Sequence, residues 1–148
     1  MKTLFLDANI FLYALGAESP HRESCQQLLL AVGEGRLDGV TDAGVLQELL
    51  HVRRRRLDPQ QAAEAVQEAA ALVREVLPVT AQNVQRAGRL LMEIEALSAR
   101  DALHAAVMEE HEIQILISLD ADFDQVPFLR RLTPGEALNF ADSYPARG

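Results

Sequence analysis

The chain has 148 residues, 49% of them apolar, so it is long enough to bury one hydrophobic core and does not have the composition of a disordered protein. Its formal charge of −8 excludes a general role in coating DNA or RNA, which depends on a basic surface. With a single cysteine, Cys25, it can form neither an internal disulfide nor a thiolate metal cluster, and its only lysine, Lys2, is not part of a phosphate-binding Gly-Lys-Ser/Thr sequence.

The first half of the chain alternates short apolar runs with amphipathic segments, which predicts an α/β fold with a central parallel sheet. A strand over residues 2–6 is expected first, then a short helix over residues 10–15. Ser19-Pro20 predicts the start of a second helix, which Gly33-Glu34-Gly35 ends. A minimal strand follows at residues 39–41, and Asp42 is expected to cap a third helix.

The second half continues the same alternation. The expected elements are an Ala-rich helix from Asp58-Pro59 to about residue 74, a strand over residues 76–80, helices over residues 81–95 and 98–111, a buried strand over residues 115–118, a weak strand near Leu132 and a helix from Thr133-Pro134. Pro78 within its strand indicates an exposed hydrogen-bonding position. We expect one domain over residues 1–142 and a mobile tail over residues 143–148.

Two of the expected strands run directly into acids. Asp7 follows the first strand, and Asp120 follows the strand over residues 115–118. Ligands of open α/β sheets bind beyond the carboxyl ends of the strands, and two carboxylates there would repel each other unless a cation lay between them. A hard divalent cation is the simplest candidate. For Asp7 alone, an N-cap of the next helix is an equally good interpretation.

Two further acids lie on expected helices. Glu48 is at the border of the apolar stripe formed by Val45 and Leu49, although a solvated helix position is the usual interpretation of such a Glu. Asp101 follows Ser98 by three residues, which is the spacing of a capping box, but it also shares a helix face with core positions. We therefore expect Asp101 to lie close to the strand ends.

Asp120 is one of three acids in five residues, with Asp122 and Asp124. A plain polar turn would explain them, and the following Val126-Pro127 is incompatible with a calcium loop of the EF-hand type. Phe123 is expected to anchor this turn in the core.

Together these segments resemble the PIN domain, in particular the single-domain ribonucleases of the VapC toxin type, over nearly the whole chain. The segments that carry the resemblance are Asp7-Ala8-Asn9-Ile10-Phe11-Leu12-Tyr13-Ala14, Glu48 in a helix, Arg100-Asp101-Ala102-Leu103-His104-Ala105-Ala106, and Ser118-Leu119-Asp120-Ala121-Asp122-Phe123-Asp124. The resemblance implies a three-layer α/β/α sandwich with an acidic pocket for Mg²⁺ or Mn²⁺ above the strand ends.

The resemblance also implies roles for individual residues. Asp7, Asp101 and Asp120 would be the principal metal ligands, and Glu48 would complete the catalytic quartet. The supporting positions would be Asn9, Ser118, Asp122 and Asp124, of which the two turn acids vary among related sequences. The implied reaction is hydrolysis of RNA phosphodiester bonds to 5′-phosphate and 3′-hydroxyl ends. The implied partner is an antitoxin that places a helix or an arginine in the acidic site, and a homodimer is expected.

Two other features are open to more than one interpretation. His104 could be a proton shuttle, but on an Ala-rich helix it is more readily a packing or hydrogen-bonding residue. The run Arg53-Arg54-Arg55-Arg56 fits a solvated helix end, where cations are favoured, or a phosphate contact beside the acidic pocket.

Two alternatives remain at the level of function. A PIN-like binding module with structural acids would keep the fold without the chemistry. A receiver or phosphatase-like domain with Asp7 as phosphoacceptor would need a lysine far along the chain and a second acid at Asn9. The sequence holds no run of ~18 apolar residues and does not begin like a signal sequence, so we expect an unprocessed, cytoplasmic protein without a membrane segment.

Overall fold

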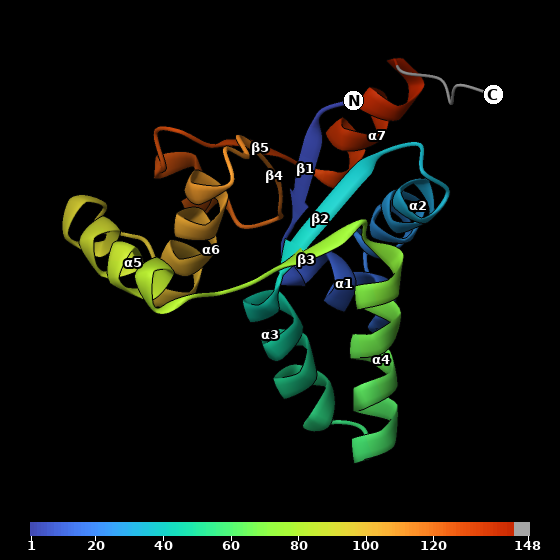
Figure 1. The fold of residues 1–148 in the computed structure, drawn as a ribbon. Helices are drawn as coiled ribbons and strands as arrows, with labels where there is room; N and C mark the ends of the chain where they lie inside the picture. The colour runs from blue at the N-terminus through green and yellow to red at the C-terminus, as the bar shows by residue number, and fades with distance from the viewer. Residues whose placement is uncertain (144–148) are drawn as a thin grey trace.

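The computed structural model describes residues 1–143, over which five parallel strands form one sheet in the order β3-β2-β1-β4-β5 (Figure 1). The strands are β1 (Thr3–Leu6), β2 (Asp38–Asp42), β3 (Glu75–Leu77), β4 (Ile115–Ile117) and β5 (Arg130–Leu132). The α-helices are α1 (Ala8–Leu15), α2 (Arg22–Gly33), α3 (Ala43–Arg54), α4 (Pro59–Leu72), α5 (Ala81–Glu93), α6 (Ala99–Glu110) and α7 (Pro134–Ser143). A short 3₁₀ helix, η1 (Ala121–Gln125), joins β4 to β5.

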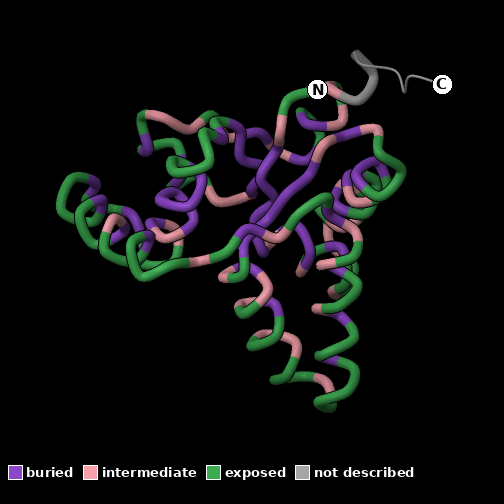
Figure 2. Tube along the Cα trace, viewed as in Figure 1, coloured by how far each residue is buried: buried purple, intermediate pink, exposed green. Residues whose placement is uncertain are grey.

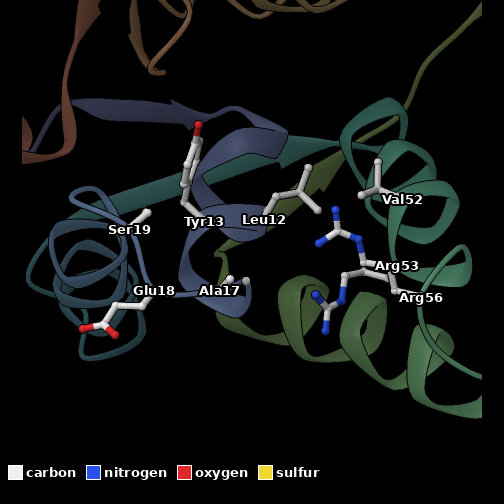
Figure 3. Close-up of a pocket in the computed structure, with 9 residues that line it drawn as sticks. Leu12, Tyr13, Ala17, Glu18, Ser19, Val52, Arg53 and Arg56 are labelled. Carbon is white, nitrogen blue, oxygen red and sulfur yellow. The ribbon is translucent and has the colours of Figure 1, made fainter.

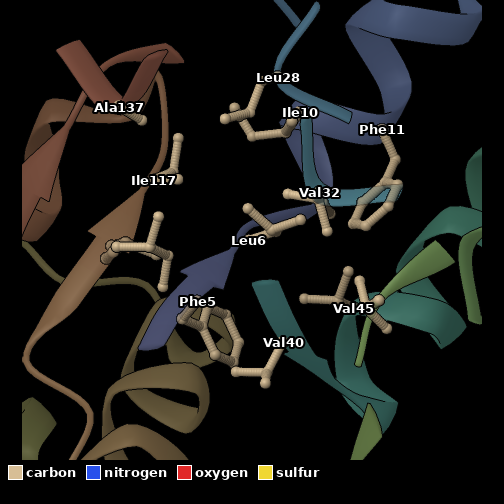
Figure 4. Packing of buried hydrophobic residues seen from close by; sticks show 14 of the residues in the cluster. Phe5, Leu6, Ile10, Phe11, Leu28, Val32, Val40, Val45, Ile117 and Ala137 are labelled. Atoms are coloured by element: carbon tan, nitrogen blue, oxygen red, sulfur yellow. The ribbon is translucent and has the colours of Figure 1, made fainter. Parts of the chain in front are cut away.

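The central strand is β1, which pairs in parallel with β2 on one side and β4 on the other. Its residues Leu4, Phe5 and Leu6 are buried, as the continuous apolar run predicts for a strand covered on both faces. Figure 4 shows Leu6 packed together with Ile10 of α1 and Val32 of α2.

Helices cover both faces of the sheet, so the predicted three-layer α/β sandwich is confirmed. Helices α5 and α6 lie on one side, and α2, α4 and α7 lie on the other (Figure 1). The chain moves outward from β1 to β3 and then crosses back to β4, which makes the boundary between β1 and β4 the topological switch point of the sheet. Ligands of open α/β sheets bind at this point, beyond the carboxyl ends of the strands.

Most helices begin after a residue whose side chain caps the first turn. The side chains of Asp42, Asp58 and Ser98 accept a hydrogen bond from a backbone N–H there, as the sequence predicted. Thr80, which was expected in the preceding strand, caps α5 in the same way. Helices α3 and α4 form a hairpin whose surface is exposed toward its tip (Figure 2).

Several predicted boundaries differ from the structure by one or more residues, and three of them are informative. Helix α2 begins at Arg22 rather than at Pro20, because Ser19 accepts a hydrogen bond from the backbone of His21 and forms a turn before the helix. Strand β3 ends at Leu77, so Pro78, which has no N–H to donate, lies outside it. Helix α7 continues to Ser143, and the rest of the predicted tail, residues 144–148, lies outside the described residues.

The single cysteine belongs to the hydrophobic core. Cys25 is fully buried, and burial raises the pKa of its thiol to about 11, so it is a packed hydrophobe and not a nucleophile. Across residues 1–143, none of the helices has the length and apolar character required to cross a membrane.

Candidate active site

The predicted quartet of acids comes together at the switch point of the sheet. Asp7 lies directly after β1 and Asp120 three residues after β4, while Glu48 is on the second turn of α3 and Asp101 in the first turn of α6. We call these four residues the acidic site. The four residues are close enough for their charges to interact, since Glu48 and Asp101 each interact electrostatically with Asp7.

Asp7 is the most buried of the four, with 5% of its surface exposed. One carboxylate oxygen accepts a hydrogen bond from the backbone N–H of Ala8 at 2.8 Å, so the predicted N-cap role is confirmed. The other accepts a hydrogen bond from the hydroxyl of Ser118 at 2.7 Å. Burial raises the pKa of Asp7, although the charge of His104 and these two hydrogen bonds oppose the rise.

The hydroxyl of Ser118 connects three parts of the site. It donates to Asp7 and accepts hydrogen bonds from the side-chain amide of Asn9 at 3.1 Å and from the backbone N–H of Asp120 at 3.0 Å. A hydroxyl has one proton to donate and two lone pairs, so its capacity is fully used. Asn9 and Ser118 thus lie where the sequence placed them, beside the acids.

Asp101 and Asp120 form a second part of the acidic site, together with Asp122. Burial, the adjacent carboxylate of Asp120 and the charge of Asp7 raise the pKa of Asp101 to about 7. Asp120 also accepts a hydrogen bond from the backbone N–H of Asp122 at 2.9 Å, which orients its carboxylate at the start of η1. Phe123 is fully buried, so it anchors this turn as predicted.

Asp124 is not brought to the other acids. Its carboxylate makes a two-point contact with the guanidinium of Arg131, at 2.9 and 3.1 Å. Arg131 also donates to the backbone carbonyl of Ser118 at 3.1 Å. The pair therefore supports the turn that carries Asp120 from outside. No motif in the sequence indicated this role for Arg131.

Glu48 points into the acidic site from α3, as its place at the border of the apolar stripe predicted. One of its carboxylate oxygens accepts a hydrogen bond from the guanidinium of Arg100 at 2.8 Å. The side chain of Arg100 is half exposed, so this ion pair is weak and free to open.

His104, for which the sequence favoured a packing or hydrogen-bonding role over that of a proton shuttle, is a member of the site. Its ring is fully buried next to the ring of Phe5, and its Nδ1 lies 2.8 Å from a carboxylate oxygen of Asp42, which is also fully buried. Its Nε2 lies 4.0 Å from Glu48. Burial lowers the pKa of His104, but the bond to Asp42 and the charges of Asp7 and Glu48 outweigh it and raise the pKa overall.

The arginine run, residues 53–56, begins at the C-terminal end of α3, the helix that carries Glu48. Arg53 and Arg56 line a pocket with Leu12 and Tyr13 near the C-terminal end of α1 (Figure 3). Asp7 caps the opposite end of α1, about 12 Å away by helix length. Arg53 follows Glu48 by only five residues, about 7.5 Å along α3, so the run lies on the surface next to the Glu48 side of the acidic site.

The residues present fit a divalent cation. Two groups each offer ligand atoms that all lie within 4.8 Å of one another: Asp7, Glu48 and His104, and Asp101, Asp120 and Asp122. Five of these six residues are carboxylates, the donors that hard cations such as Mg²⁺ and Mn²⁺ prefer.

Comparison with known proteins gives the family. A model of the PIN domain matches residues 4–129. Ribonuclease VapC13 of Mycobacterium tuberculosis is 42% identical over 132 residues, which cover 87% of this chain and 98% of the relative. Ribonuclease VapC7 of the same species is 32% identical over 142 residues, covering 90% of this chain and 93% of the relative.

Solved structures share the fold. VapC20 of Mycobacterium tuberculosis, a sarcin-ricin loop cleaving toxin, superposes with a TM-score of 0.71 at 23% identity, covering 85% of this chain and 96% of that one. VapBC2 of Rickettsia felis, solved with a promoter DNA fragment, gives a TM-score of 0.69 at 19% identity, with 88% and 98% covered. The chain belongs to the PIN-domain family, and within it to the VapC ribonucleases.

Proposed function

We propose that this protein is a Mg²⁺- or Mn²⁺-dependent endoribonuclease and the toxin of a type II toxin–antitoxin pair. The observation that carries the proposal is the convergence of Asp7, Glu48, Asp101 and Asp120 at the switch point of the sheet, from four separate segments of the chain. Membership of the VapC ribonucleases gives the class of reaction. We further propose that one PIN domain spans residues 1–142 and acts in the cytoplasm, where its RNA substrate is found.

Asp7, Asp101 and Asp120 would hold the ion, and Glu48 would complete the site. A divalent ion bound there supplies a nucleophile at neutral pH and relieves negative charge on the phosphate. Ser118 and Asn9 hold Asp7 and the start of the 118–124 turn in place, and Asp122 orients Asp120 through its backbone N–H. We expect 5′-phosphate and 3′-hydroxyl products, and recovery of 2′,3′-cyclic phosphates would contradict this mechanism.

The proposal is tested by cleavage of a mixed RNA pool with Mg²⁺ or Mn²⁺, comparing the wild type with Asp101→Asn. The variant keeps the size of the side chain but removes one negative ligand, so we expect cleavage to fall by at least ~100-fold. Glu68→Gln on the exposed surface of α4 is the matched control, since it removes one charge from a helix that carries none of the four acids. A pure, folded wild type that neither cleaves RNA nor binds either metal would favour a PIN-like binding module instead.

An antitoxin partner is part of the proposal. Several similar structures are complexes of a VapC-type toxin with its antitoxin, among them VapBC from Salmonella typhimurium and VapBC-1 from nontypeable Haemophilus influenzae. We propose that the antitoxin of this protein closes the acidic site with a helix or an arginine. We also propose a homodimer, for which the exposed Leu30 of α2 and Leu50 of α3 offer apolar surface. Light scattering of the purified protein checks the dimer directly.

We propose that the arginine run, residues 53–56, contacts RNA phosphates outside the acidic site. In a chain of net charge −8 it is the one concentrated basic segment of the sequence. Replacing all four residues with Ala should weaken RNA binding and reduce its salt dependence. The slope of the logarithm of the binding constant against the logarithm of the salt concentration should fall in magnitude by up to about four if each arginine contacts one phosphate. Filter binding at several salt concentrations measures both, and an unchanged slope would contradict the proposal.

A further inference from the structure

We propose that Nε2 of His104 is a metal ligand beside Asp7 and Glu48, so that the acidic site is a mixed nitrogen–oxygen site rather than one made of carboxylates alone. The inference rests on the proposed function, because it concerns the ion that the acidic site would hold. It adds a ligand that neither the sequence motifs nor the quartet of acids indicated.

Nε2 of His104 is buried, unpaired and close to two of the acids. The His104 side chain is fully buried, and this nitrogen has no hydrogen-bond partner among residues 1–143. It lies 4.0 Å from a carboxylate oxygen of Glu48, and one ligand atom each of Asp7, Glu48 and His104 lie within 4.8 Å of one another. Ligands about 2.1 Å from one ion are separated by about 3.0 to 4.2 Å, so small adjustments bring all three onto one ion.

The imidazole of His104 is oriented by the carboxylate of Asp42. Asp42 uses one carboxylate oxygen to cap α3, accepting from the backbone N–H of Val45 at 2.8 Å, and directs the other to Nδ1 of His104 at 2.8 Å. A neutral imidazole in this arrangement carries its proton on Nδ1 and turns the lone pair of Nε2 toward the acids. Metal-binding histidines in proteins are typically oriented by a carboxylate in this way.

Residues around the pair of Asp42 and His104 restrict it to this orientation. Gly44 lies against both partners: a Cβ at this position would be 3.2 Å from the carboxylate of Asp42 and 3.3 Å from Cε1 of His104. On the other side the ring of Phe5 packs at 5.7 Å between ring centroids. The imidazole is therefore held in place by its neighbours and does not merely fill a gap in the core.

A nitrogen ligand has a consequence for the choice of metal. Imidazole favours transition metals, whereas Mg²⁺ prefers sites made of oxygen. We therefore expect the protein to bind Mn²⁺ more tightly than Mg²⁺. Replacing His104 should weaken Mn²⁺ binding by at least ~10-fold and Mg²⁺ binding much less.

The test uses the full chain loaded with Mn²⁺ and read by pulsed electron paramagnetic resonance, which detects a histidine nitrogen bound to the ion. The wild type is measured unlabelled and with ¹⁵N-histidine, so this arm needs no variant. His104→Gln, which can still donate to Asp42, is compared with His51→Gln, an exposed histidine on the same chain. We expect nitrogen coupling that changes with the isotope, is absent in His104→Gln and persists in His51→Gln.

A second measurement uses titration of Mn²⁺ and Mg²⁺ into the same proteins and into Asp42→Asn. Loss of the orienting carboxylate should weaken Mn²⁺ binding by about 10- to 100-fold. An equal loss for both metals would indicate a structural role only and would overturn the inference.

The outcomes separate this inference from the proposed function. Mn²⁺ that binds in the acidic site without histidine coupling would overturn the role of His104 and leave the nuclease proposal standing. Coupling that persists in His104→Gln would likewise overturn it, because another histidine would be the source. A wild type that binds no Mn²⁺ would overturn both.

Discussion

A single buried hydroxyl, that of Ser118, orders the acidic site at the scale of one residue. Its three hydrogen bonds reach Asp7, Asn9 and the backbone of Asp120, which come from the ends of two strands. Loss of this hydroxyl would leave the carboxylate of Asp7 buried without the side-chain donor to its second oxygen.

We predict that Ser118→Ala lowers the free energy of unfolding by about 1–3 kcal/mol, the range for leaving buried polar groups unpaired. Since the Ser118 hydrogen bond holds the pKa of Asp7 down, the variant should also need a higher pH to ionise Asp7, so the acid limb of the activity profile moves to higher pH. Urea unfolding and a pH–rate profile measure the two effects. Ser24→Ala on α2 removes a half-buried hydroxyl whose one hydrogen bond, to the carbonyl of His21, is exposed, so it should change both quantities much less.

At the residue scale, acids at strand ends were predictable and buried polar pairs were not. Asp7 and Asp120 follow short apolar runs, and the architecture of parallel sheets brings such positions together. The pair of Asp42 and His104 joins residues 62 positions apart, through the packing of α3 beside α6. The available signal was a lone histidine on an Ala-rich helix, and it did not indicate a partner.

At the opposite, amino-terminal ends of the strands, Asp38 joins separate segments of the chain as Ser118 does at the carboxyl ends. It is the first residue of β2, and it accepts hydrogen bonds from Thr3 of β1 and from Arg74, which precedes β3. One carboxylate therefore links the starting ends of three neighbouring strands.

We predict that Asp38→Asn costs about 0.5–1 kcal/mol of unfolding free energy at pH 7, a modest value because Arg74 is half exposed. Burial raises the pKa of Asp38, but the bonds from Arg74 and Thr3 hold it below its usual value overall. A depressed pKa gives stability that is complete above the unfolded value and is lost as pH falls through the folded one.

The difference between wild type and variant should therefore shrink as pH falls below about 4. Urea unfolding at neutral and acidic pH, with Arg74→Gln as the second corner of a double-mutant cycle, measures this dependence. A difference that stays constant across pH would contradict the ion pair as its cause.

At the scale of helices and strands, the sequence predicted an element correctly where its local signals agreed. The predicted boundaries were wrong where contacts with another part of the chain set the end of the element. The cap Asp42 and the dipeptide Asp58-Pro59 placed α3 and α4 correctly. Strand β3 is shorter than its apolar run, because among residues 1–143 it pairs with β2 alone and ends directly before Pro78. The pairing partner of a strand is not visible in its local sequence, so the proline by itself did not show whether the strand continued beyond it.

At the scale of the whole molecule, metal binding should stabilise the fold. A site that exists only in the folded state adds about 2.7 kcal/mol at a hundredfold excess of metal over its Kd, or roughly 5–10 °C in Tm for a domain of this size. The pKa of Asp101 near 7 means that protons compete for the site in acid. We therefore predict a larger Tm shift with Mn²⁺ above pH 7 than at about pH 5.

Thermal unfolding with and without Mn²⁺ at both pH values measures this shift. Asp101→Asn should lose most of the shift and its pH dependence, whereas Glu68→Gln should keep both. A shift in the wild type that is equal at the two pH values would show that Asp101 does not take part in binding.

The order of the acids along the chain has a consequence for how the protein is made. Strand β1 is made before the other strands and is the centre of the sheet, but one of its two neighbours is β4, and Asp120 follows only after it. At 5–20 residues per second, roughly 6–23 s pass between the synthesis of Asp7 and that of Asp120. The proposed nuclease is therefore inactive during this interval, which gives an antitoxin time to meet the growing toxin before its acidic site is assembled.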